Sequence, residues 1–175
     1  KYAAGEDFTL QITYHTSYVN NSDPNNIWGS TGKGIRFFEP TSTEPRRRKQ
    51  LWTAGFPEGN RYWFPCHDVA DDLRTTELKA TVDKQMTVVS NGALVSETAN
   101  NDGTLTFHYR MDTPYANYNT GIVVSEYKNV KQQYEKVVLN NYSYPDEEEA
   151  TAASVERLPD MMRYFSEITG LTYPY

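Results

Sequence analysis

Hydrophobic and polar residues alternate along much of this chain, which is the period-two pattern of half-buried β-strands. The alternation predicts a first strand over residues 8–14, and it returns at 75–82, where Leu78, Ala80 and Val82 share one face. Further strands are predicted at residues 35–38, 86–90, 93–98, 104–111, 121–127 and 134–139. Because turn residues separate these strands about every ten positions, the pattern favours an all-β sandwich or a related β architecture.

Turn-forming residues mark the connections between these strands. Residues 20–34 are rich in Asn, Ser, Asp, Pro and Gly and predict a long surface loop, and residues 39–50 predict a polar connector. The Asp102-Gly103 pair predicts a tight hairpin turn, because these residues adopt positive φ at low cost.

The pattern changes near the C-terminal end. Acidic residues 146–149 precede good helix formers and predict a helix whose first turn carries a favourable charge. Pro159 fits the first turn of a second helix, whose apolar stripe ends at Gly170. We therefore expect a β domain over residues 1–145, missing its first strand or strands, and a short helical segment over 146–175.

Composition and charge narrow the function classes. The chain has 175 residues, of which 38% are hydrophobic and 23% charged, as in an ordinary globular domain. The formal net charge of -6 argues against nucleic acid as a partner, and no apolar run approaches the ~18 residues that a membrane span needs. The basic run at 45–49 predicts a solvated loop, with a localisation or heparin-binding patch as the alternative.

The stretch at 51–68, LWTAGFPEGNRYWFPCHD, combines bulky apolar residues with Pro and Gly at a density that predicts a buried, shaped loop. Residues 63–65 are expected to anchor this loop in a core. Arg61 is expected to pair with Asp68, Asp71 or Asp72, because a buried charge needs a partner. The residues expected to form the structural core of the stretch are Arg61, Trp63, Pro65, Cys66 and Asp68.

This stretch resembles the WTQGEPEDNRYWFPCYD type of segment in the amino-terminal domain of zinc aminopeptidases of the aminopeptidase N and leukotriene hydrolase family. The resemblance implies a non-catalytic, saddle-like β domain that docks on the catalytic domain of the same polypeptide and forms one wall of the peptide-substrate cleft. It also implies that the helical segment at 146–175 leads into that catalytic domain, and that zinc belongs to the catalytic domain. The resemblance continues, in the family's order, through TTELKATV at 75–82, VSNGAL at 89–94, TGIVVSEY at 120–127 and LPDMMRYFSEITGLTYPY at 158–175.

By the same resemblance, Ala54, Gly55 and Phe56 are the residues that face the substrate. In the family an acid or amide at the Glu position of this loop helps to hold the free amino group of the substrate. Here Phe56 occupies that position, and Ala54 occupies the upstream Gln position. Two interpretations stay open: Phe56 lines an altered specificity pocket of an active peptidase, or the parent protein has lost peptidase activity and kept the fold as a scaffold.

The residues themselves show no hydrolytic centre. Zinc hydrolysis needs His-Glu-x-x-His on a helix, and none of His15, His67 and His108 has those neighbours. We expect no metal or other cofactor in this chain. A stand-alone module that binds carbohydrate or peptide through its aromatic residues is the alternative of a different class, and exposure of Trp28 and Trp52 on one flat face would favour it.

Overall fold

The structure is a computed structural model that describes residues 3, 5–16 and 34–173. The loop predicted from residue 20, and Trp28 within it, lie outside the described residues except for Gly34. Within the described part, nine β-strands are followed by two α-helices. The prediction of an all-β sandwich with a short helical segment at the C-terminal end is confirmed.

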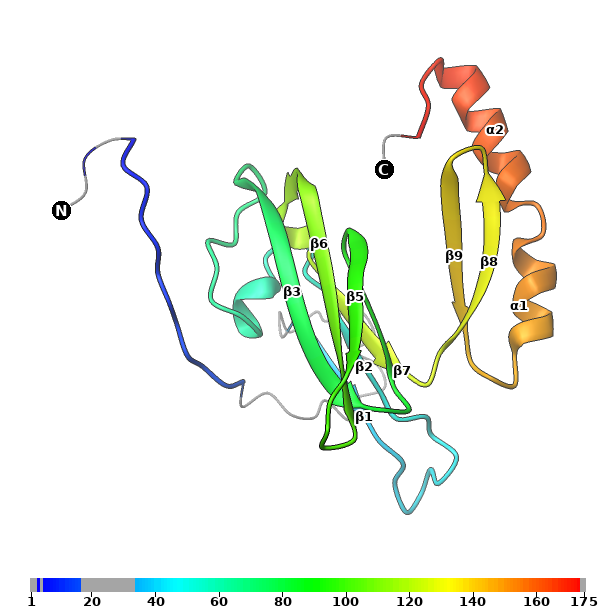
Figure 1. The fold of residues 1–175 in the computed structure, drawn as a ribbon, viewed down its shortest axis with the longest axis horizontal. Helices are drawn as coiled ribbons and strands as arrows, with labels where there is room; N and C mark the ends of the chain where they lie inside the picture. Colours follow the sequence, from blue (N-terminus) through cyan, green and yellow to red (C-terminus); the bar gives the residue numbers. More distant parts are fainter. Residues whose placement is uncertain (1–2, 4, 17–33, 174–175) are drawn as a thin grey trace.

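Four short strands form the first sheet, in the order β1-β2-β7-β4, with every pair antiparallel (Figure 1). The register pairs Trp52 with both Arg36 and Val123. The sequence pattern missed β2, which lies at the start of the stretch that predicted a loop. The strands are β1 Ile35–Phe38, β2 Gln50–Thr53, β4 Thr87–Ser90 and β7 Ile122–Ser125.

Longer strands form the second sheet, in the order β3-β6-β5: β3 Leu73–Asp83, β5 Ala93–Ala99 and β6 Thr104–Ala116. The predicted hairpin turn joins β5 to β6. Gly103 has a φ of +82°, and its N–H donates to the Asn100 carbonyl at 3.3 Å. Positive φ is what a glycine accepts without strain, so the turn fixes the register of this hairpin.

The two sheets enclose one hydrophobic core. Tyr109 on β6 crosses this core, and its hydroxyl donates to the Val88 carbonyl on β4 at 2.8 Å. Burial raises the pKa of the Tyr109 phenol, so it remains a donor at ordinary pH. The buried core residues are Met86, Val88, Phe107, Tyr109 and Val124.

A separate hairpin follows the sandwich: β8 Lys128–Tyr134 and β9 Val137–Ser143 pair antiparallel. The prediction of one strand over 134–139 was wrong, because the chain reverses inside that range. Glu135 turns there with a φ of +49°. A glutamate seldom occupies this conformation, so the sequence carries no turn signal at this point.

Two helices pack against this hairpin, α1 Glu148–Val155 and α2 Leu158–Thr169 (Figure 1). Pro159 lies in the first turn of α2, and Gly170 ends it with a φ of +66°, as predicted. Neither helix has the length and apolar character needed to cross a membrane. The apolar stripe of α2 is exposed, with exposed fractions of 53% at Met161, 60% at Phe165 and 60% at Ile168.

The strand predicted over residues 8–14 is absent. Figure 1 shows this segment as an extended trace beside the sheets, and no strand is assigned to it. The alternation of apolar side chains was real, but a strand also needs a hydrogen-bonded neighbour, which no described residues supply here. The alternating side chains are exposed: Phe8, Leu10, Ile12 and Tyr14.

The basic run at 45–49 ties the sandwich to the hairpin and helices. Arg48 donates to both carboxylate oxygens of Asp146, at 2.8 and 2.9 Å, and its guanidinium lies 4.0 Å from the ring centre of Tyr144. The Tyr144 hydroxyl in turn donates to the Gln50 side chain at 2.7 Å. These contacts place part of the basic run in intramolecular pairs at the junction.

Candidate functional site

The loop after β2, residues 54–68, is called the central loop here. Its backbone turns back on itself, because the Gly59 N–H donates to the Gly55 carbonyl at 2.7 Å. A Cβ on Gly55 would lie 2.5 Å from the Tyr118 carbonyl oxygen. Only glycine allows this approach, so the sequence Gly-x-x-x-Gly shapes the loop tip. A short 3-10 helix, Asn60–Tyr62, follows the turn.

Two asparagines that the sequence did not single out hold the base of the central loop. Asn60 is fully buried; its side-chain N–H donates to the Asn117 carbonyl at 2.6 Å, and its side-chain oxygen accepts from the Trp63 indole at 2.7 Å. Asn117 is also fully buried, and its side chain donates to Asp68 and, at 3.5 Å, to the Cys66 sulfur. The base is therefore a buried polar network whose side chains have hydrogen-bond partners.

The ion pair predicted for the central loop is present. Arg61 donates from Nε to Asp68 at 3.4 Å and from its backbone N–H at 3.0 Å. The Asp68 side chain is only 1% exposed, so these donors and Asn117 offset the cost of burying its charge. The same guanidinium reaches Glu58 at 2.6 Å.

The remaining residues expected in the core of the loop differ in how far they are buried. Trp63 and Phe64 are partly buried, with ring centres 4.4 Å apart. Cys66 is also partly buried. The expectation that Pro65 anchors the loop by burial was wrong, since Pro65 is exposed. In this part of the loop the partly buried apolar side chains are those of its neighbours Trp63 and Phe64.

The tip of the central loop carries the residues that the resemblance places toward a substrate. Phe56 is 75% exposed and meets Tyr118 edge-on at 5.6 Å between ring centres. Ala54 is partly buried and Gly55 is buried. The nearest acid along the loop, Glu58, is engaged by Arg61. Residues 54–57 therefore present an aromatic, uncharged surface, and none of their side chains can hold an ammonium group by charge.

The histidines lie apart and show no metal chemistry. His108 accepts or donates through Nε2 at 2.6 Å to Glu77 on β3, whereas His67 pairs with Asp72 at the surface. Among the residues that the structure describes, no three His, Cys, Asp or Glu side chains cluster as metal ligands would. The donor groups of the described residues therefore do not fit a zinc centre.

One family model and several known proteins are similar to this chain. The family model for the Peptidase M1 N-terminal domain matches residues 2–119. Transcription initiation factor TFIID subunit 2 of Gallus gallus is 28% identical over 145 residues, covering 81% of this chain and 12% of that protein. The same subunit of Drosophila melanogaster is 28% identical over 147 residues, with the same coverage.

An aminopeptidase is also similar to this chain. Endoplasmic reticulum aminopeptidase 1 of Rattus norvegicus is 22% identical over 172 residues, covering 98% of this chain and 17% of that protein. The chain therefore spans less than a fifth of the length of these curated relatives.

Proposed function

Because the chain belongs to the Peptidase M1 N-terminal domain family, we propose that it is a non-catalytic β domain that docks on a catalytic-type domain of the same polypeptide. The exposed apolar stripe of α2 supports this docking. Met161, Phe165 and Ile168 lie on one helix face and are each at least half exposed, although residues of this kind are usually covered in a complete protein.

We further propose that the parent protein uses this domain as a scaffold for assembly rather than for peptide cleavage. The lack of a charged side chain at residues 54–57 of the central loop carries this proposal. An aminopeptidase loop that orients the substrate ammonium needs an acid or amide there, whereas this chain presents Phe56 and Ala54. The likeness to TFIID subunit 2, whose name describes a subunit of a transcription initiation factor, supports a role in such an assembly.

The second candidate is the wall of a peptidase cleft, with amine recognition left to the catalytic domain and zinc held there. The likeness to endoplasmic reticulum aminopeptidase 1 along 98% of this chain favours it. In that case Phe56 and Tyr118 would contact an apolar substrate side chain. A carbohydrate or peptide platform built on Trp52 has less support, because Trp52 is partly buried and stacks on Phe38 at 5.8 Å.

Full-length parent protein, purified with and without added zinc, separates the two candidates. We expect no hydrolysis of leucyl or arginyl aminomethylcoumarin above that of a heat-inactivated sample. We also expect no gain from Phe56→Glu, with Phe56→Leu as the size-matched control without charge. Robust wild-type hydrolysis would overturn the scaffold proposal in favour of the peptidase. In that event a gain of roughly tenfold or more in Phe56→Glu alone, the worth of one charged hydrogen bond, would identify position 56 as a lost amine ligand.

A further inference from the structure

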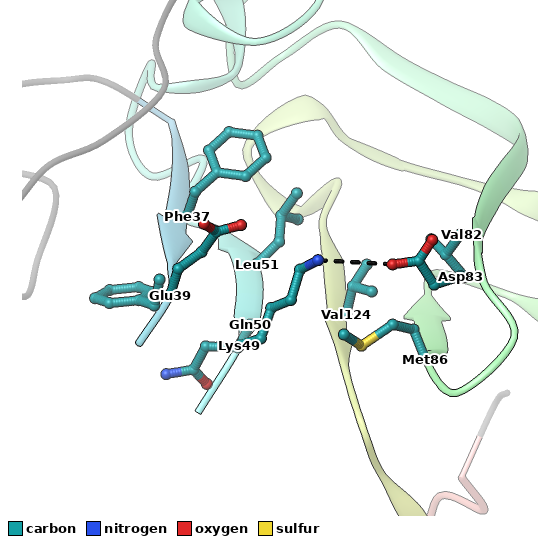
Figure 2. Close-up of a pocket in the computed structure, with 10 residues that line it drawn as sticks. Phe37, Glu39, Lys49, Gln50, Leu51, Val82, Asp83, Met86 and Val124 are labelled. Atoms are coloured by element: carbon teal, nitrogen blue, oxygen red, sulfur yellow. Dashed lines mark ion pairs between the residues drawn. The ribbon is translucent and has the colours of Figure 1, made fainter. Parts of the chain in front are cut away.

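A pocket opens between the two sheets at the end of β2 opposite the central loop (Figure 2). Its volume is about 270 Å³, and most of its wall is apolar. Met86 and Val124 at its floor belong to the sandwich core, while Phe37, Leu51 and Val82 remain partly exposed around it. The space suits one large apolar side chain, because its wall is mostly apolar and no described side chain fills it.

Charged groups rim the mouth of this pocket. Lys49 at the start of β2 reaches Asp83 at the end of β3, with 3.6 Å between the ammonium and the carboxylate, as Figure 2 shows. Glu39 stands on the rim beside β1, and none of its described neighbours forms an ion pair or hydrogen bond with it. Two carboxylates thus face one ammonium, and the rim carries a net negative charge.

The basic residues nearby do not cancel this charge by pairing with Glu39. Arg47 pairs with Glu44 at 3.3 Å and lies over the Phe38 ring at 4.6 Å, and Arg48 is held by Asp146. Within the part of the chain that the structure describes, Glu39 therefore has a free acceptor beside the apolar pocket. A segment that combines an apolar side chain with an adjacent cation complements both features.

We propose that this pocket docks a partner polypeptide, which inserts one large apolar side chain and places a neighbouring Lys or Arg against Glu39 and Asp83. The inference goes beyond the proposed function, because it concerns the opposite end of β2 and holds for a scaffold and for a peptidase alike. The charge of the rim selects the cation, and the shape of the pocket selects the apolar anchor.

Methyl NMR of the 175-residue chain tests this proposal. Of its four methionines, Met86 lies in the pocket wall, whereas Met162 lines a separate apolar hollow on α2 and reports non-specific binding. With ¹³C-methyl methionine, we expect acetyl-Gly-Phe-Lys-Gly-amide to shift Met86 saturably. The peptide with Glu in place of Lys should bind about two- to fivefold more weakly, the range for exposed ion pairs. The peptide with Ala in place of Phe should not shift Met86.

Two variants locate the contact. Glu39→Gln should lower the affinity for the Lys peptide about two- to fivefold. It should not lower the affinity for the Glu peptide. Glu156→Gln, an exposed acid between α1 and α2, should change neither affinity and controls for the overall negative charge. Equal binding of the Lys and Glu peptides would overturn the proposal, as would Met162 shifting as much as Met86. A Met86 shift that follows protein concentration without peptide would assign the pocket to a second copy of the chain and would also overturn it.

Discussion

Asn60→Ala tests whether the base of the central loop depends on the buried amide network. The substitution removes the donor to the Asn117 carbonyl at 2.6 Å and the acceptor for the Trp63 indole at 2.7 Å. Leaving a buried polar group unsatisfied costs about 1–3 kcal/mol. The Asn117 carbonyl stays buried, while the partly buried Trp63 can regain water, so we expect a loss of about 2–4 kcal/mol in the free energy of unfolding.

The assay is urea unfolding followed by circular dichroism, with tryptophan fluorescence, which sums Trp28, Trp52 and Trp63, as a second probe. Asn129→Ala is the matched control, because that side chain also makes an amide hydrogen bond, to Asn140 at 2.8 Å, but at an exposed site. The control should lose less than about 0.5 kcal/mol. If Asn60→Ala costs no more than Asn129→Ala, the network does not stabilise the loop and the reasoning fails.

Two further substitutions test the core and the junction. Tyr109→Phe leaves the Val88 carbonyl without its donor inside the core, and we expect a loss of about 1–2 kcal/mol in the free energy of unfolding, measured in urea; an unchanged midpoint would refute the cross-sheet hydrogen bond. Arg48 holds the pKa of the Asp146 carboxyl below its ordinary value. The ion pair therefore stabilises the fold at pH values above the unfolded-state pKa of Asp146, and this stabilisation is lost as the pH falls through the lower folded-state pKa. Asp146→Asn should therefore be less stable than wild type near pH 6 and equally stable near pH 2, and a stability gap that persists in acid would contradict this assignment.

Local signals in the sequence predicted the elements whose conformation is set by neighbouring residues. Asp102-Gly103 predicted the β5–β6 turn, and Pro159 with Gly170 predicted the ends of α2. The same approach missed the turn between β8 and β9, because Glu135 adopts positive φ without the Gly or Asn that usually marks it. It also placed a strand at residues 8–14, where the alternation is present but the described structure offers no neighbouring strand.

The central loop also contains one contact that the sequence predicted and one that it did not. A buried charge needs a partner, so the sequence predicted that Arg61 pairs with a nearby aspartate; the structure identifies that aspartate as Asp68, seven positions along the chain. Asn60 and Asn117 are separated by 57 positions, and each looks like an ordinary turn residue. Their burial depends on how the sheets bring β6 beside the loop, which no local pattern encodes.

In the central loop, the residues that fix the backbone are different from the residue that is exposed at the tip. Asn60, Asp68 and Asn117 fix its backbone through buried hydrogen bonds, whereas the Phe56 side chain is mostly exposed and takes no part in that network. A change of side chain at position 56 therefore alters the chemistry of the tip with little cost to the fold. Under the proposed function, this independence lets an M1-type domain exchange an amine-binding loop for an uncharged contact surface while keeping the same β sandwich.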